Sequence, residues 1–297
     1  MSLPSPLLLH FEEDQPAAEQ LARACGMVTA AIARHRFPDG ELKLRLPPQL
    51  PARVVLLRSL HHPNEKLTEL LLVAPAARTL GAQHLTLVTP YLAYMRQDMA
   101  FNPGEVVSQR IVGRFLAGLF DAVLTVDPHL HRVATLEEAV PVPQAVVLSG
   151  APLLARLIAE RLENPLLIGP DEESAQWIAQ AAQGHGFDFG VCRKVRHGDR
   201  DVQIELPTVN VHGRSVVVLD DVASSGRTLA GAARLLLAAG AATVDVAVTH
   251  ALFAGDALQV IQDAGVRQVW STDTITHPSN AVSMAESIAQ ALQALHA

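Results

Sequence analysis

Short apolar runs alternate with segments of helical periodicity along most of the 297-residue chain. The runs predict buried strands at Val54–Leu57, Leu85–Val88, Val123–Val126, Leu166–Ile168, Val216–Leu219 and Val244–Val248. Between them, apolar residues recur three and four positions apart, which predicts helices at Leu67–Leu80, Val107–Leu119, Leu153–Leu162, Ser174–Gln183 and Ala230–Ala239. Strands and helices that alternate in this order form mainly parallel sheets flanked by helices. We therefore predict an α/β fold.

The pattern is similar in two halves of the chain. His84–Asp98 and Arg214–Thr228 each run from an apolar strand through a loop to charged residues. The segment Pro141–Pro143 interrupts the pattern between them, so we predict one domain over residues 1–143 and a second over residues 144–297. The segment Ala281–Ala297 is rich in alanine and leucine at helical spacing, and this last helix could pack on either domain.

The composition narrows the class of protein. A formal net charge of −7 argues against a general nucleic-acid binder. Cys25 and Cys192 lie too far apart in the sequence to suggest a zinc site or a disulfide framework. The segment Met1–His10 has no basic region and only a short apolar run, so we expect it to be a poor signal peptide. No apolar run reaches the roughly 18 residues that a membrane span needs. We expect a soluble cytoplasmic protein with no membrane partner.

The stretch Val216–Leu229 carries the most informative chemistry. Asp220 and Asp221 follow the apolar part of a strand, and Ser224–Thr228 forms a loop rich in hydroxyls before a helical pattern that starts at Leu229. Ligands of open α/β sheets bind at the carboxyl ends of the strands, and a helix N-terminus attracts phosphate. Two carboxylates suit sugar hydroxyls or a divalent metal, so the stretch predicts a sugar-phosphate site. A plain turn with a helix cap is the alternative interpretation.

Two further segments contain residues suited to a nucleotide. Arg36–Glu41 places a turn at Pro38–Gly40, which would present one aromatic ring and two carboxylates that could bind a base. A simple hairpin turn is the alternative. Arg96 follows a strand and could bind phosphates with both arms of its guanidinium, unless it only forms an ion pair with Asp98.

Three other segments carry candidate metal ligands or cations. Thr125–His131 places Asp127, His129 and His131 after a strand, which suits a metal ion or an ordinary loop histidine. Gly169–Asp171 adds a carboxylate after another strand. The basic segment Arg193–Asp201 is either a solvated loop or a mobile lid that brings cations onto a phosphoryl-type transition state.

Taken in order, these motifs resemble the ribose-phosphate pyrophosphokinase family, also called phosphoribosyl pyrophosphate synthetases. The resemblance covers nearly the whole chain, with softer matches at 249–250, 253–255 and 273–275. The matching segments are Arg36–Glu41, Pro90–Asp98, Thr125–His129, Gly169–Asp171, Lys194–Arg196 and Val216–Leu229. It implies two phosphoribosyltransferase-like domains with the active site between them. It also implies transfer of the diphosphoryl group of ATP to the 1-hydroxyl of ribose 5-phosphate, with Mg²⁺ as cofactor.

The resemblance further implies residue roles on the ATP side. Phe37, Asp39 and Glu41 would bind adenine from a neighbouring subunit, which implies a homo-oligomer. Arg96 and Gln97 would bind the ATP phosphates.

The remaining roles concern the metal, the transition state and the acceptor. His129 would contact the catalytic Mg²⁺, and Asp171 a second cation near the ribose. Lys194 and Arg196 would stabilise the transition state. The acceptor would be bound by Asp220 and Asp221 through its ribose hydroxyls and by the loop residues through its 5-phosphate, namely Ser224, Ser225, Gly226, Arg227 and Thr228.

The chain departs from the family pattern at several positions. The phosphate loop usually reads Asp-Thr-Gly-Gly-Thr, whereas here it contains Ser224 and Arg227. Met99 and Ala100 replace basic residues that help allosteric members bind phosphate and ADP, so we expect the behaviour of the smaller, non-allosteric members. Three alternatives stay open: a non-catalytic regulatory homologue, a phosphoribosyltransferase, and an enzyme that uses a different phosphosugar.

Overall fold

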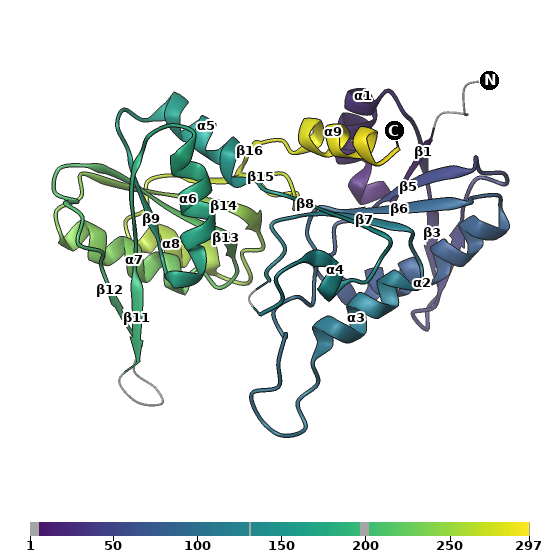
Figure 1. Cartoon of the computed structure of the whole chain (residues 1–297), viewed down its shortest axis with the longest axis horizontal. Helices are drawn as coiled ribbons and strands as arrows, with labels where there is room; N and C mark the ends of the chain where they lie inside the picture. The colour runs from purple at the N-terminus through teal and green to yellow at the C-terminus, as the bar shows by residue number, and fades with distance from the viewer. Residues whose placement is uncertain (1–5, 131, 197–201, 297) are drawn as a thin grey trace. The chain divides into compact units, whose positions relative to one another are not determined.

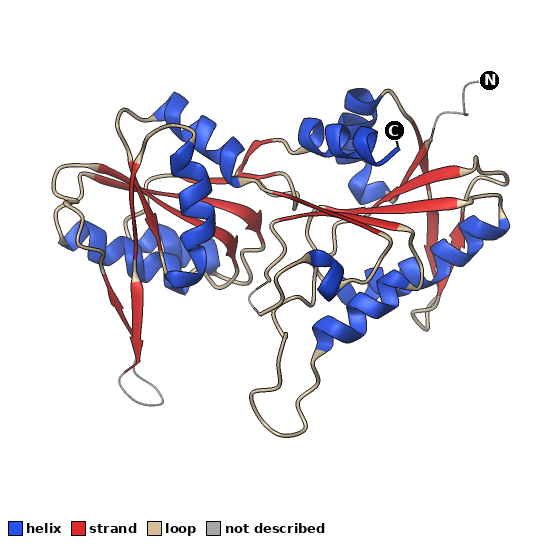
Figure 2. Cartoon of the chain, viewed as in Figure 1, coloured by secondary structure: helices blue, strands red, loops and turns tan. Residues whose placement is uncertain are grey.

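The computed structural model describes residues 6–130, 132–196 and 202–296. The chain divides into two compact units (Figure 1). The first unit comprises Met1–Leu148 and Met284–Ala297, and the second comprises Ser149–Ser283. Each unit contains a parallel sheet with helices packed against it (Figure 2). This architecture confirms the predicted α/β fold with two similar halves.

The first unit is organised around a six-stranded parallel sheet of order β2-β1-β5-β6-β7-β8. Its strands are β1 (Leu7–His10), β2 (Val28–Ala31), β5 (Arg53–Leu57), β6 (His84–Thr89), β7 (Ala122–Val126) and β8 (Gln144–Leu148). Its helices are η1 (Glu12–Asp14), α1 (Gln15–Cys25), α2 (Pro63–Thr79), α3 (Ser108–Ala117), α4 (Leu136–Ala139) and α9 (Ala285–His296). A separate hairpin pairs β3 (Ala33–Arg36) with β4 (Leu42–Arg45). β2 lies on one side of β1 in the sheet, and β5 and the later strands lie on the other side. The strand order therefore reverses between β1 and β5, which makes this position a topological switch point.

The second unit repeats this plan with the strand order β10-β9-β13-β14-β15-β16. Its strands are β9 (Leu166–Gly169), β10 (Asp188–Val191), β13 (Ser215–Ala223), β14 (Thr243–Ala251), β15 (Val269–Thr272) and β16 (Asn280–Val282). Its helices are α5 (Ala151–Arg161), η2 (Glu172–Ser174), α6 (Ala175–Gln183), α7 (Arg227–Ala238) and α8 (Ala257–Asp263). The antiparallel pair β11 (Arg193–Arg196) and β12 (Val202–Glu205) projects from the sheet (Figure 1). Here the switch point lies between β9 and β13.

Burial on both faces explains why the central strands are continuous apolar runs. Val216 and Val218 of β13 belong to the core beneath α7 and α8. Val217 and Leu219, which alternate with them, belong to the core beneath α5 and α6. Strands of parallel sheets read as unbroken apolar runs for this reason. All six strands expected from such runs are present.

The division between the units differs by one strand from the expected boundary. β8 begins at Gln144 and pairs with β7, so the structure divides the chain after Leu148 rather than after residue 143. The last helix, α9, packs against α1 in the first unit (Figure 1).

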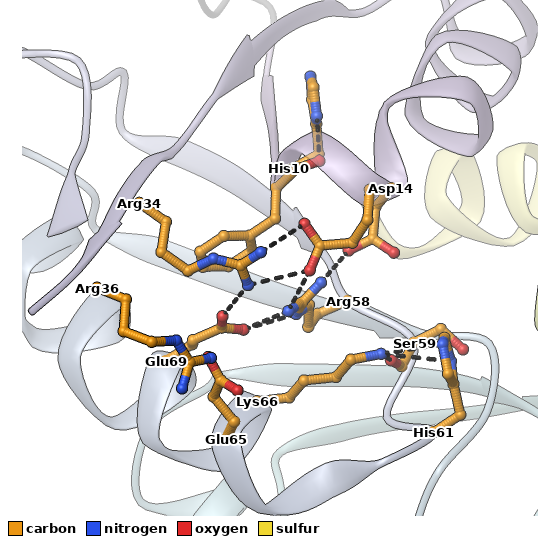
Figure 3. A network of polar contacts seen from close by, with 12 residues as sticks. His10, Asp14, Arg34, Arg36, Arg58, Ser59, His61, Glu65, Lys66 and Glu69 are labelled. Atoms are coloured by element: carbon orange, nitrogen blue, oxygen red, sulfur yellow. Dashed lines mark hydrogen bonds and ion pairs between the residues drawn. The ribbon is translucent and has the colours of Figure 1, made fainter. Parts of the chain in front are cut away.

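A buried ion network fills the switch point of the first unit (Figure 3). Arg58 directly follows β5 and is 1% exposed. Its Nη1 lies 2.6 Å from Asp14 Oδ2, and its Nε donates to Glu69 Oε2 at 2.8 Å. Arg34 of the hairpin binds Glu69 as well, and it binds Glu13 Oε1 at 3.0 Å. The network therefore connects the β1–α1 junction, β5, α2 and the hairpin.

A second buried cation lies beside this network. Lys66 of α2 donates from Nζ to the carbonyl oxygen of Ser59 at 2.6 Å, and its ammonium contacts the ring of His61 (Figure 3). Burial, followed by the positive charge of Arg58, lowers the pKa of Lys66 to about 8. Burial and the charge of Lys66 lower the pKa of His61 to about 4.

Replacing Arg58 by methionine should strongly destabilise the chain. Asp14 and Glu69 would lose their buried partner, and breaking a buried ion pair costs about 3–5 kcal/mol. Arg78→Met is the matched control, because Arg78 and Asp121 form an ion pair with both side chains 34% exposed. That control should cost less than about 1 kcal/mol. Urea denaturation measures both free energies of unfolding, and equal losses would contradict the role of burial.

Lys66 should make stability depend on pH on the alkaline side. Its folded-state pKa of about 8 lies below the ordinary value of 10.5. The folded chain therefore releases this proton first as the pH rises, and the free energy of unfolding rises across that window. Lys66→Met removes the titrating group, so the wild type should gain stability relative to the variant between pH 8 and 10.5. Urea titrations at several pH values test this expectation, and a constant difference would refute it.

Candidate active site

The most informative sequence stretch forms a strand, a tight loop and a helix N-terminus in the second unit. β13 runs through Asp220 and Asp221 to Ala223, so it is longer than its apolar part suggests. The loop is short, because α7 begins at Arg227 rather than near Leu229. Gly226 precedes the helix with a φ of +70°, a conformation that favours glycine. Arg227 and Thr228 therefore lie in the first turn of α7.

Three carboxylates gather at the carboxyl edge of this sheet. Asp171 lies two residues after the end of β9. β9 pairs with β13, the strand that carries Asp220 and Asp221. Burial, followed by the charges of Asp221 and Asp171, raises the pKa of Asp220 well above its ordinary value. Asp171 also caps η2, accepting a hydrogen bond from the Glu173 backbone N–H at 3.2 Å. Crowded carboxylates of this kind are relieved by hydroxyl donors or by a cation.

Hydroxyls and backbone N–H groups lie next to these carboxylates. The side chains of Ser224, Ser225 and Thr228 form no hydrogen bond with any other residue that the structure describes. Arg227 is exposed. The first N–H groups of α7 have no partner within the helix, so its N-terminus is suited to an anion. The structure thus brings together the residues predicted to bind a sugar phosphate.

In the first unit, two loops that follow neighbouring strands are joined by an ion pair. Asp98, in the loop after β6, accepts from Arg132 Nη1 at 2.7 Å and from the Arg132 backbone N–H at 3.3 Å. Asp98 therefore pairs with Arg132, not with Arg96, and Arg96 is exposed. The sequence does not predict this pairing, because Arg132 lies 34 positions from Asp98.

These two loops also carry the expected ATP-phosphate residues and the expected metal residue. Arg96 and Gln97 lie in the loop after β6, and His129 lies in the loop after β7. Gln97 Nε2 donates to the carbonyl oxygen of Met99 at 3.0 Å, which fixes its side chain. Asp127, at the start of the second loop, has a φ of +35°. Such backbone strain in a non-glycine residue occurs often at functional sites.

The turn of the β3–β4 hairpin presents the residues expected to bind a base. Gly40 N–H donates to the carbonyl oxygen of Phe37 at 2.9 Å, and Asp39 Oδ1 accepts from the Glu41 N–H at 3.2 Å. The Phe37 side chain is 40% exposed. A hollow of about 510 Å³ lies beside the turn, lined by Arg36, Gly40, Glu41, Leu42, Glu65, Thr68 and Leu72. The segment is therefore a hairpin turn whose ring and carboxylates are accessible.

The expected lid begins as a strand. Arg193–Arg196 forms β11 and pairs with β12. Residues 197–201, like the side chains of Lys194 and Arg196, lie outside what the structure describes, as does His131. The roles expected for Lys194 and Arg196 therefore stay predictions.

These features define a class of protein: a two-domain α/β protein of the phosphoribosyltransferase type. Residues 7–119 match the model of the N-terminal domain of ribose phosphate pyrophosphokinase, and residues 144–287 match that of the phosphoribosyl transferase domain. The chain belongs to the ribose-phosphate pyrophosphokinase family.

Similar proteins cover nearly the whole length of the chain. A ribose-phosphate pyrophosphokinase of Methanopyrus kandleri is 36% identical over 97% of this chain and 99% of the relative. One of Halobacterium salinarum is 36% identical over 96% of this chain and 100% of the relative. The crystal structure of phosphoribosylpyrophosphate synthetase from Mycobacterium smegmatis has the same fold, with a TM-score of 0.86, 24% identity and 99% coverage of both chains.

No helix within the described ranges is long and apolar enough to cross a membrane.

Gly226→Ala should destabilise the chain more than the same change at a comparable glycine. A Cβ at Gly226 would lie 2.8 Å from the carbonyl oxygen of Ala257, whereas one at Gly213 would meet nothing within 4 Å. Both glycines have a φ near +70°, at +70° and +73°. Gly213→Ala should therefore lower the free energy of unfolding only by the conformational cost, which is about 1–2 kcal/mol. Urea denaturation compares the two variants, and an equal loss would mean that the loop accommodates the methyl group.

Proposed function

We propose that this chain is a ribose-phosphate diphosphokinase. The C1 hydroxyl oxygen of ribose 5-phosphate attacks the β-phosphorus of ATP, and the bond from that phosphorus to the oxygen bridging to the α-phosphorus breaks. The products are phosphoribosyl pyrophosphate, AMP and a proton. The observation that carries the proposal is the pair Asp220–Asp221 near the carboxyl end of β13, which leads through a short loop to the N-terminus of α7.

The second unit would bind the acceptor. In this proposal Asp220 and Asp221 accept hydrogen bonds from the ribose 2- and 3-hydroxyls. The 5-phosphate binds the loop hydroxyls, the N-terminus of α7 and the exposed guanidinium of Arg227. The raised pKa of Asp220 supports this role, because two hydroxyl donors would relieve the crowding of charge.

The first unit would bind the donor. Arg96 and Gln97 contact the ATP phosphates in this proposal, and the exposed hairpin turn with Phe37, Asp39 and Glu41 binds adenine of a second copy. A shared adenine site makes the enzyme a homo-oligomer. Its substrates, ATP and ribose 5-phosphate, fit the expected cytoplasmic location.

Mg²⁺ is the proposed cofactor, and the donor set suits it. Among residues whose placement is described, no three His, Cys, Asp or Glu side chains converge into a complete metal site. Mg²⁺ commonly binds one or two protein groups together with substrate phosphates and water, so this chain fits an ion that arrives with ATP. His129 and Asp171 would contact it, and when bound it neutralises charge on the phosphoryl oxygens.

The protein's contribution to the chemistry is mainly positioning and charge. Phosphoryl transfer needs little covalent help, and none of the proposed residues acts as a nucleophile. Lys194 and Arg196 would place positive charge on the transition state. The non-catalytic homologue is the weaker alternative, because both cations and His129 are present in the sequence.

A product assay with matched variants tests the proposal. The wild type with ATP, Mg²⁺ and ribose 5-phosphate should form AMP and phosphoribosyl pyrophosphate in equal amounts, and chelation of Mg²⁺ should stop the reaction. Lys194→Ala should lower kcat by about 100–1,000-fold, as expected for one lost charge contact, with ATP affinity unchanged. Arg193→Ala, one position earlier on β11, is the control and should keep near-normal turnover.

Two results would contradict the proposal. Absence of AMP at any metal concentration would refute the diphosphokinase activity, and normal turnover of Lys194→Ala would refute its role. The exposed Arg227 at the phosphate site favours testing a panel of phosphosugars in the same assay. A faster reaction with another acceptor would change the substrate but keep the reaction class.

A further inference from the structure

The segment that follows β14 forms backbone hydrogen bonds with the loop expected to bind phosphate, residues 224–226, and with the residue before it. Phe253 N–H donates to the carbonyl oxygen of Ala223 at 2.8 Å, and Ala254 N–H donates to that of Ser224 at 2.9 Å. A phosphate-binding loop must direct N–H groups toward the anion, since carbonyl oxygens repel it. These two bonds therefore engage the carbonyl oxygens that precede the helix N-terminus.

The same segment also contacts the end of the loop. A Cβ on Gly226 would lie 2.8 Å from the carbonyl oxygen of Ala257, at the first residue of α8. The backbone from Phe253 to Ala257 thus follows the loop from its beginning to its last residue. Any movement of this segment would move the loop with it.

Phe253 holds a backbone conformation that needs support. Its φ is +34°, which is unfavourable for a bulky residue. Its side chain is 9% exposed and belongs to the core beneath α7 and α8. Its ring centroid lies 4.8 Å from that of His277, with the rings tilted by 40°. Strained residues persist when the surrounding contacts fix them, and here the core and His277 supply those contacts.

His277 is itself fixed by its neighbours. Its backbone N–H donates to Asn280 Oδ1 at 2.9 Å, and its Nδ1 lies 2.7 Å from Ser279 Oγ. Asn280 Nδ2 donates in turn to the carbonyl oxygen of Thr272 at 2.6 Å. Burial lowers the pKa of His277, which favours the uncharged ring that packs on Phe253. The loop between β15 and β16 is thereby connected to the phosphate loop.

We infer that Phe253 and His277 are positioning residues for the acceptor's phosphate group. They hold the 253–257 segment, which keeps the carbonyl oxygens of Ala223 and Ser224 engaged and leaves the N-terminus of α7 available to the phosphate. Neither side chain touches substrate in this role. The inference rests on the proposed function, because it takes ribose 5-phosphate as the ligand of this loop.

His277→Ala tests the inference. Loss of the ring contact should raise the dissociation constant and the KM for ribose 5-phosphate by about 10- to 100-fold, the scale of a small misplacement of binding groups. The dissociation constant for ATP should stay unchanged, because ATP would bind in the first unit. Ribose, which lacks the phosphate, should bind the wild type and the variant equally.

A matched histidine–phenylalanine pair provides the control. His185 stacks on Phe187 with ring centroids 5.2 Å apart. This pair directly precedes β10, so it lies at the amino edge of the same parallel sheet, opposite to Phe253. His185→Ala removes the same ring and should leave ribose 5-phosphate binding unchanged. Phe253→Leu, which keeps apolar volume but loses the aromatic contact, should weaken that binding as His277→Ala does.

The outcomes separate this inference from the proposed function. Calorimetric titration measures the binding of ribose 5-phosphate and needs no turnover. If the wild type binds ribose 5-phosphate but forms no AMP, the diphosphokinase activity is refuted, and the titrations of the variants still test the positioning role. The inference is overturned if His277→Ala and Phe253→Leu bind ribose 5-phosphate within about twofold of the wild type. It is also overturned if His185→Ala weakens binding equally, or if the wild type binds no ribose 5-phosphate.

Discussion

The burial of one guanidinium determines how the first unit is assembled. Arg58 is almost fully enclosed, and a buried cation is tolerated only with close anionic partners. Those partners come from different elements, since Glu13 and Asp14 precede α1 and Glu69 belongs to α2. Glu69 also binds Arg34 of β3, so the hairpin that carries the exposed turn is attached to the same charge cluster. The need to pair the buried charge of Arg58 thus also determines the position of the β3–β4 hairpin and its exposed turn.

The two units use the same topological position in opposite ways. Between β1 and β5, opposite charges pair with one another. Between β9 and β13, Asp171, Asp220 and Asp221 place like charges together, and burial, followed by these charges, raises the pKa of Asp220. A closed cluster stabilises a fold, whereas crowded carboxylates are relieved by a ligand that donates hydrogen bonds or carries positive charge. The fold alone therefore does not decide which switch point binds ligand.

The sequence predicted the parts of the structure that depend on local pattern. Strands buried on both faces, such as β5 and β7, are continuous apolar runs, and the carboxylates that follow β9 and lie in β13 could be assigned to one sheet edge. The ion network of Arg58 could not be predicted, because Asp14 lies 44 positions away. The partner of Asp98 was missed for the same reason. The apolar pattern places the start of α7 two residues too late, because its first two residues, Arg227 and Thr228, are polar.

Backbone strain marks the same edges as the predicted chemistry. Among the residues that the structure describes, five non-glycine residues have a positive φ: His62, Tyr94, Asp127, Asn164 and Phe253. His62, Tyr94 and Asp127 lie in the loops after β5, β6 and β7, and Phe253 follows β14, so four of the five follow the carboxyl ends of strands. Asn164 precedes β9, but asparagine tolerates this conformation well. Where only a turn is needed, glycine or asparagine can adopt a positive φ without strain, as Gly81 and Gly240 do after helices α2 and α7. The bulky residues Tyr94 and Phe253, which lie in loops at the carboxyl edges of the two sheets, therefore indicate that side chains, and not only the turns, are required there.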